Sequence, residues 1–285
     1  MHPVLIDLGF FKLHTYGLMM AVAFMVGMQL AVRDARRIDL SPKRDFDQFI
    51  LDLCFWILIS ALIGARVVFI LVNWEQDYSK DPLKVIRIWE GGLVFYGGLI
   101  GAVLFSIYYC RKKKHSFLLI ADTLIPMVAL GQFFGRLGCF AAGCCWGRPV
   151  SESYFGAVQF PAGSLAHNSM RYTQQIADDA LHTIHVHPVQ LYESTGALTI
   201  FFILQWMRTK KRFNGQQLLT YMFLYPLLRS TLEMVRGDRE RGVYNIVGNL
   251  ELSTSQLISI GFAISAVTLL TVLLLRRKRE AAALA

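Results

Sequence analysis

The sequence predicts an all-α membrane protein of about seven transmembrane helices, and three observations carry this prediction. Hydrophobic residues make up 54% of the 285 positions and charged residues only 17%, which is more apolar than a water-soluble domain requires. The apolar residues form blocks of about 20, the length a helix needs to cross a bilayer. Lys and Arg gather between alternate blocks. Residues 1–285 are therefore expected to form a single polytopic membrane domain.

Seven apolar blocks give the expected spans in order along the chain. The first is a retained span and not a cleaved signal peptide, because it lacks a basic leading region and a small-residue cleavage site. The fifth is the least apolar, since Tyr192, Glu193 and Ser194 stand at its start. The expected spans are Tyr16–Val32, Phe49–Val72, Leu93–Cys110, Leu118–Phe140, Leu191–Met207, Leu218–Val235 and Leu257–Leu275.

The distribution of basic residues predicts the orientation of these spans. Of the 29 Lys and Arg residues, 17 lie in the loops and tail on one side, 9 lie on the other side and three lie within spans. The positive-inside rule then places the N-terminus outside and the C-terminus in the cytoplasm. The same scattering over short loops argues against nucleic-acid binding, despite a net charge of +9.

One long polar segment, residues 143–188, separates the fourth and fifth spans and is expected to form a small extracytoplasmic head. It contains a β-like piece at Tyr154–Phe160 and a polar stretch at Ser169–Leu181 that is expected to be helical. Its length suits a cap on the membrane domain better than an independent domain.

Three arginines lie inside the expected spans, where a charge costs roughly 2.5–3.5 kcal/mol and usually serves a function. Arg66, Arg136 and Arg229 each stand a few residues before the outer end of a span. At 1.5 Å per residue they lie roughly 6–9 Å from the outer interface, at the depth of lipid headgroups.

Each arginine has an alternative interpretation. Arg229 and Glu233 are spaced i,i+4, so an internal salt bridge competes with a ligand role. Arg236 shares their face and has only Asp238 and Glu240 as evident partners, so it is expected to be freer to meet a ligand.

For Arg136 the alternative is snorkelling to the interface, but the glycines beside it in Gly135–Gly138 favour close packing and a ligand role. For Arg66, snorkelling to the interface and a ligand role are equally favoured.

Two tyrosines stand at the same level as the arginines. Tyr16 opens the first span and Tyr96 lies near the outer start of the third; each alone is also typical of an aromatic belt. Because arginine forks bind phosphate in bidentate fashion, Tyr16, Tyr96, Arg136 and Arg236 together predict a site for an anionic phospholipid headgroup. Two GxxxG pairs, Gly97 with Gly101 and Gly131 with Gly135, are expected to let helices approach closely, and Gly97 and Gly98 serve either helix packing or close approach of a ligand.

Cys139, Cys144 and Cys145 cluster near the outer end of the fourth span. Their spacing is not that of a zinc motif, so packing as small apolar side chains is favoured, with a disulfide among them as the alternative. No metal and no cofactor is expected.

Six motifs in order give the sequence a family resemblance. The run from Gly135-Arg136-Leu137-Gly138 to Gly147-Arg148 resembles the signature of the bacterial prolipoprotein diacylglyceryl transferases, and five further stretches match in the family's order. These are His14–Met19, Gly64–Arg66, Trp89–Gly98, His187–Glu193 and Arg229–Arg236. Two departures stand out: Cys139, Ala142 and Cys144 replace Asn, Asn and Glu of the usual signature, and Tyr96 stands where a histidine is common.

The resemblance implies an activity and a site. Family members move the diacylglyceryl group of phosphatidylglycerol to the lipobox cysteine of a prolipoprotein, in the first step of lipoprotein maturation at the bacterial cytoplasmic membrane; a thioether forms and glycerol phosphate leaves. The resemblance makes Arg136 and Arg236 the principal headgroup residues and Tyr16 a functional one. We predict Tyr96, Arg136 and Arg236 as catalytic residues, with Tyr96 orienting the thiol or relaying its proton. The predicted substrate-binding residues are Tyr16, Arg66, Gly97, Gly98, Arg136, Gly147, Arg229, Glu233 and Arg236. The rival class is a transporter or lipid flippase that uses the same arginines, for which inverted repeats or broken helices would be typical.

Overall fold

The computed structural model describes residues 4–9, 12–38, 45–79, 81–85, 87, 91–237, 243–247 and 250–284. Seven helices of 18 residues or more lie within these ranges, and each overlaps one of the expected spans. They are α1 (Thr15–Ile38), α2 (Phe46–Val72), α3 (Phe95–Lys113), α4 (Phe117–Ala142), α6 (Val189–Arg208), α7 (Gln216–Glu233) and α8 (Thr254–Leu284).

Three of these helices, α1, α2 and α4, are long and apolar enough to cross a membrane, with mean hydropathies of 1.6, 2.5 and 1.8 over 18 residues. The chain is therefore a mostly helical protein with membrane-compatible helices, while seven spans and their orientation stay predictions. Helices α4 and α7 continue through Pro126 and Pro226, so neither proline breaks its helix as in many transporters.

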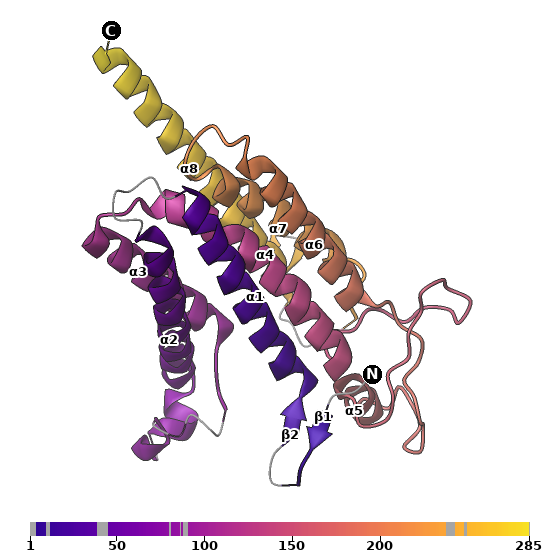
Figure 1. The fold of residues 1–285 in the computed structure, drawn as a ribbon. Coiled ribbons are helices and arrows are strands. Elements are labelled where there is room, and N and C mark those ends of the chain that lie inside the picture. Colours follow the sequence, from indigo (N-terminus) through magenta and orange to yellow (C-terminus); the bar gives the residue numbers. More distant parts are fainter. Residues whose placement is uncertain are drawn as a thin grey trace. The chain divides into compact units, whose positions relative to one another are not determined.

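Contacts divide the chain into two compact units, which we describe separately: residues 28–123, and residues 1–27 with 124–285. In the first unit α2 and α3 lie side by side (Figure 1). Gly64, Gly97 and Gly101 meet at this contact, where a Cβ on any of them would collide with backbone of the facing helix. The expected packing role of Gly97 and Gly101 is thereby confirmed, and Gly98 likewise faces the backbone of Ala61.

Not every glycine pair marks such a contact. Gly131 and Gly135 have the same spacing, but a Cβ on Gly131 would meet no described atom within 4 Å, and one on Gly135 would meet only the sulfur of Met20 at 3.5 Å. The predicted close approach of helices at Gly131 is wrong for the described part of the chain.

We expect Gly101→Ala to destabilise the first unit by about 1–3 kcal/mol, because the added methyl must displace backbone at Ser60 and Gly64. Thermal unfolding of the purified protein in detergent measures the effect. Gly131→Ala is the matched control, with an expected change near zero or a slight stabilisation; equal losses in the two variants would contradict the packing assignment.

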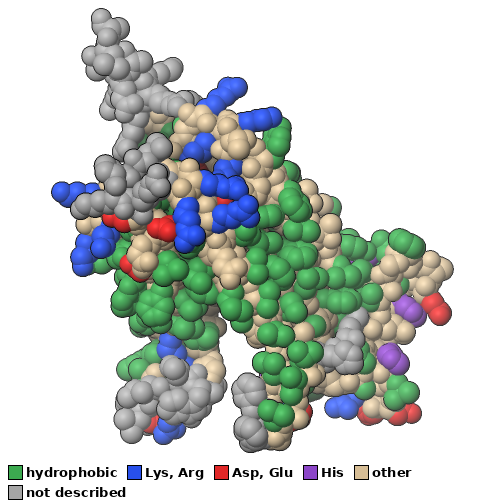
Figure 2. All heavy atoms as spheres, in the orientation of Figure 1, with side chains coloured by type: hydrophobic (Ala, Val, Ile, Leu, Met, Phe, Trp, Pro, Cys, Tyr) green, Lys and Arg blue, Asp and Glu red, His purple; other side chains and the backbone are tan. Residues whose placement is uncertain are grey.

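The helix flanks in this first unit are apolar. Figure 2 shows hydrophobic side chains over the flanks of α2 and α3, with Lys and Arg both above and below them. Large exposed side chains on α2 and α3 include Phe55, Ile63, Leu71 and Leu104, each more than half exposed. Such a surface suits contact with lipid better than contact with water.

The second unit contains α4, α6, α7 and α8, with α6 packed on α7 and α7 on α8 (Figure 1). The hydroxyl of Ser194 donates to the carbonyl of Phe133 at 3.1 Å and joins α6 to α4. Gly138 of α4 lies close to Tyr16 and Met19 of α1, and a Cβ on it would lie 3.1 Å from Cδ2 of Tyr16.

Two antiparallel hairpins were not predicted from the sequence. They are β1 (Val4–Asp7) with β2 (Lys12–His14), and β3 (Val243–Val247) with β4 (Leu250–Ser253). Both are short, and short strands beside long apolar helices give a weak periodic signal.

The head segment 143–188 packs around a small core of its own. Phe160, Ala166, Met170 and Val186 are buried in it, with Phe140 and Trp146 against them. Its helix is α5 (Leu165–Tyr172), which begins after Ser164, whose hydroxyl accepts from the amide of His167. The helix expected at Ser169–Leu181 is thus misplaced, because the capping serine starts it earlier. Among the described residues, Tyr154–Phe160 forms no strand, only a bridge from Val158 to Val186.

Candidate active site

A carboxylate shared by two arginines lies at the centre of the second unit. The Nη2 of Arg136 on α4 lies 2.9 Å from Oε1 of Glu193 on α6. The Nη1 of Arg236, just beyond α7, lies 3.9 Å from Oε2 of the same carboxylate. The hydroxyl of Tyr225 on α7 also donates to Oε1 at 3.2 Å. We call Arg136, Glu193 and Arg236 the arginine–glutamate cluster; its net charge is +1.

The members of this cluster differ in exposure. The side chains of Glu193 and Arg236 are 1% and 3% exposed, whereas that of Arg136 is 20% exposed. Of the two cations, Arg136 is therefore the one with donor groups open to a ligand.

The position of Arg236 corrects an expectation. Asp238 and Glu240, its expected partners, lie outside the described residues, and the structure pairs Arg236 with Glu193 instead. The expectation that Arg236 is the freer arginine was wrong, because Glu193 stands in a different helix and sequence spacing does not reveal the pairing.

The pair Arg229–Glu233 is present on α7, with Nη1 and Oε2 2.7 Å apart. The predicted i,i+4 salt bridge is confirmed. It accounts for the tolerance of both charges in an apolar helix and makes a headgroup role for Arg229 unnecessary.

Strand-like pairing of two loops holds Arg236 in place. The amide of Arg148 donates to the carbonyl of Val235 at 2.9 Å, and Gly147 and Arg236 form an isolated bridge. A Cβ on Gly147 would lie 2.5 Å from Cβ of His187. Gly147 is thus explained by the close meeting of the loop after α4, the start of α6 and the end of α7.

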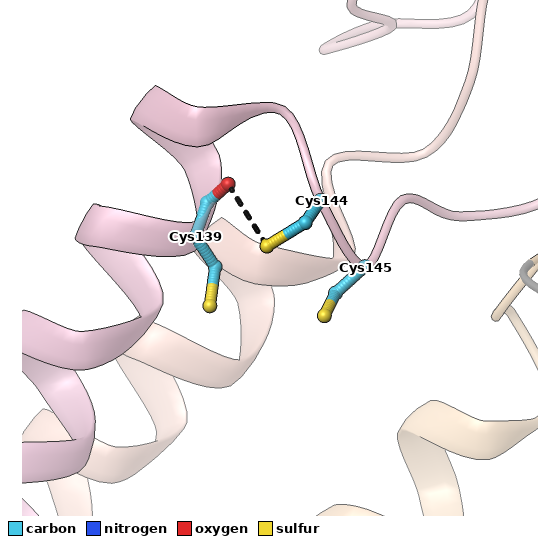
Figure 3. A group of neighbouring side chains, drawn as sticks. All are labelled: Cys139, Cys144 and Cys145. Carbon is cyan, nitrogen blue, oxygen red and sulfur yellow. Dashed lines mark hydrogen bonds between the residues drawn. The ribbon is translucent and has the colours of Figure 1, made fainter. Parts of the chain in front are cut away.

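Three thiols converge at the end of α4 (Figure 3). Cys139 lies in the last turn of α4, and Cys144 and Cys145 lie in the loop that follows; their Sγ atoms are all within 4.8 Å of one another. The loop turns back through Gly143 and Cys145, which have φ values of +69° and +62°. Gln190 of α6 donates to the carbonyl of Cys144 at 2.7 Å and fixes the loop.

This three-thiol cluster lies beside the arginine–glutamate cluster. The neighbouring thiols of Cys139 and Cys144 lower the pKa of the Cys145 thiol, and the nearby charges of Arg136 and Arg236 lower it further. The pKa of Cys144 is raised by the same thiol contacts and by burial. Tyr16 lies within electrostatic range of Arg136 and all three cysteines.

Comparison with known proteins places this arrangement in a family. The family model described as "Prolipoprotein diacylglyceryl transferase" matches residues 3–272. The chain belongs to the prolipoprotein diacylglyceryl transferase family.

Individual relatives agree with the family match. The chain is similar to the phosphatidylglycerol–prolipoprotein diacylglyceryl transferase of Clostridium tetani, at 32% identity over 91% of this chain and 93% of the relative. That of Finegoldia magna is 34% identical over 89% and 88%. That of Xanthomonas oryzae pv. oryzae is 32% identical over 93% and 90%.

Within this family member, the other unit holds Arg66, Gly97, Gly98 and Tyr96. The guanidinium of Arg66 donates to the carbonyls of Lys84, Val85, Arg87, Gly91 and Gly92, and its side chain is buried. It also lies over the rings of Phe69 and Tyr78. Since backbone carbonyls take its donors, the geometry favours a structural role for Arg66 over headgroup binding. Tyr96, at the start of α3, is 46% exposed and packs edge-on against Phe95.

We expect Arg66→Gln to loosen the chain at Lys84, Val85 and Gly91, because a neutral amide cannot satisfy the five carbonyls that Arg66 contacts. Limited proteolysis should cut this segment faster than in the parent protein, while the affinity of the detergent-solubilised protein for phosphatidylglycerol stays unchanged. A loss of lipid binding with an unchanged rate of proteolysis would instead support a role of Arg66 in headgroup binding.

Glu193 is the site residue that sequence reasoning did not assign. Two signals pointed to it: it is an acidic residue in an expected span, and it ends the His187–Glu193 motif. Neither signal shows that its partners are Arg136 and Arg236.

Proposed function

We propose that this chain transfers the diacylglyceryl group of phosphatidylglycerol to the lipobox cysteine of a prolipoprotein. The observation that carries the proposal is the arginine–glutamate cluster, a net positive charge with one accessible guanidinium at its edge. A phosphodiester headgroup carries one negative charge, which the cluster's net charge complements. Family membership supplies the reaction class.

In this proposal Arg136 contacts the phosphate, and Glu193 and Tyr225 hold its guanidinium in a fixed orientation. Arg236 adds positive charge from behind Glu193. Positive charge placed in advance stabilises the negative charge that grows on the departing glycerol phosphate. The lipobox thiol, as thiolate, attacks the glycerol carbon, and the product is a thioether.

The membrane setting follows the sequence: about seven spans in the bacterial cytoplasmic membrane, with the site open to the outer leaflet. Tyr16 and Tyr96 are proposed to line the substrate region, with Tyr96 orienting the thiol. A neutral tyrosine hydroxyl is a weak base, so another group has to favour the thiolate.

The test supplies the purified protein with phosphatidylglycerol and a lipobox peptide. Mass spectrometry should detect the peptide with an added diacylglyceryl group, and no product should form from a peptide with Ser in place of the lipobox Cys. Transport of lipid or solute across liposomes without any lipidated peptide would favour the transporter alternative instead.

A further inference from the structure

The three-thiol cluster has the composition of a metal centre with one open position. The Sγ atoms of Cys139, Cys144 and Cys145 lie within 4.8 Å of one another, and all three residues are partly exposed (Figure 3). Thiolates bound to zinc at about 2.3 Å in tetrahedral geometry lie about 3.8 Å apart. A side-chain adjustment of about 1 Å therefore closes the cluster around an ion.

The backbone presents these thiols at some cost. Cys145 is one of three non-glycine residues with positive φ among the described residues, a conformation that costs roughly 1–2 kcal/mol for an L-residue. Gly143 precedes it in the same region of φ, and Gln190 holds the carbonyl between them. The strained loop turns Cys144 and Cys145 back toward Cys139.

Among the described residues, no fourth His, Cys, Asp or Glu joins the group. Zinc sites with four protein ligands are structural, whereas those with three leave a position for water or substrate. Arg136 and Arg236 lie within electrostatic range of Cys145, so the cluster adjoins the proposed headgroup site.

The geometry points to a zinc-type site at Cys139, Cys144 and Cys145 whose fourth position takes the thiol of the prolipoprotein substrate. This inference rests on the proposed transferase function. It also supplies what Tyr96 does not, a group that holds the nucleophile as a thiolate next to the headgroup-binding arginine.

The step balances in atoms and charge. The substrate thiol binds the metal and releases its proton to water, because coordination favours the thiolate. The sulfur attacks the glycerol carbon while the carbon–oxygen bond to phosphate breaks, and the bond's electron pair stays on the phosphate oxygen. Glycerol phosphate leaves with one more negative charge than the diester carried. The neutral thioether is a weaker ligand than a thiolate, so the position reopens.

The first test measures metal binding without activity. Full-length protein, purified under reducing conditions and stripped of metal with a chelator, is titrated with Zn²⁺ and separately with Co²⁺. We expect about one ion per chain and, with Co²⁺, a thiolate-to-cobalt charge-transfer band in the near ultraviolet. Cys144→Ser should weaken the band and the affinity, while Cys54→Ala and Cys110→Ala, which change buried cysteines of the other unit, should leave both unchanged.

The second test addresses the open position. Adding a lipobox peptide with a free thiol to the cobalt protein should strengthen the charge-transfer band, and the Ser-substituted peptide should not. Absence of specific metal binding would overturn the inference. A disulfide is favoured instead if mild oxidation lowers the number of free thiols from five to three and the reduced protein binds no metal.

Activity separates the two proposals. If the metal-free protein and Cys144→Ser transfer the diacylglyceryl group at the parent rate, the metal inference fails and the proposed function stands. If the protein binds the ion and the peptide thiol as expected but never lipidates the peptide, the proposed function fails while the site stands.

Discussion

Replacing Arg136 with Gln is expected to lower the rate of diacylglyceryl transfer by about 10²–10³-fold, the loss typical for removal of one charge-stabilising donor. Arg136 is the accessible cation of the arginine–glutamate cluster, and its guanidinium is oriented by Glu193 at 2.9 Å. Glutamine keeps polarity and much of the length but removes the positive charge and the fork. Initial rates with phosphatidylglycerol in mixed micelles and a lipobox peptide measure the effect.

Two further variants sharpen this prediction. Arg136→Lys keeps the charge but cannot bind phosphate through two parallel hydrogen bonds. Its transfer rate should therefore lie between those of the parent protein and Arg136→Gln. Arg171→Gln changes an exposed arginine of α5 in the head and should leave the rate unchanged. Parent-level activity in Arg136→Gln would remove Arg136 from the proposed mechanism.

Replacing Glu193 with Gln is expected to destabilise the protein by about 3–5 kcal/mol, because it leaves two cations facing a neutral amide in a buried site. The side chain of Glu193 is 1% exposed and contacts Arg136 and Arg236 through its two oxygens. Thermal unfolding in detergent gives the stability, and the transfer assay should show a parallel loss since Arg136 loses its orientation.

The matched comparison is Glu233→Gln, which changes the carboxylate paired with Arg229 on α7 and lies at a site that is 15% exposed. The expected loss of stability in Glu233→Gln is smaller than in Glu193→Gln. Adding Arg236→Met to Glu193→Gln removes one of the stranded cations and should recover part of the stability. If Glu233→Gln costs as much as Glu193→Gln, the carboxylate of Glu193 does not serve two cations.

Much of the site could be predicted from sequence because buried charge is conspicuous in apolar helices. Arg136, Arg229 and Glu233 stood out in this way, and the i,i+4 pairing on α7 follows from helix geometry alone. Gly97 and Gly101 were likewise recognisable as a packing pair. The GxxxG spacing did not mark a close helix contact at Gly131. Such spacing shows that glycines could allow close contact, but it does not show whether a second helix lies beside them.

The sequence by itself determined the helical class, the apolar blocks, the buried arginines and the family, because hydropathy, charge and motif order are local properties of the chain. Only the tertiary structure decided that Glu193 is the common partner of Arg136 and Arg236, that the donors of Arg66 are taken by backbone carbonyls, and that three cysteines converge. These contacts depend on which helix faces meet and on where a loop takes positive φ, and neither is encoded in the spacing of residues along one segment.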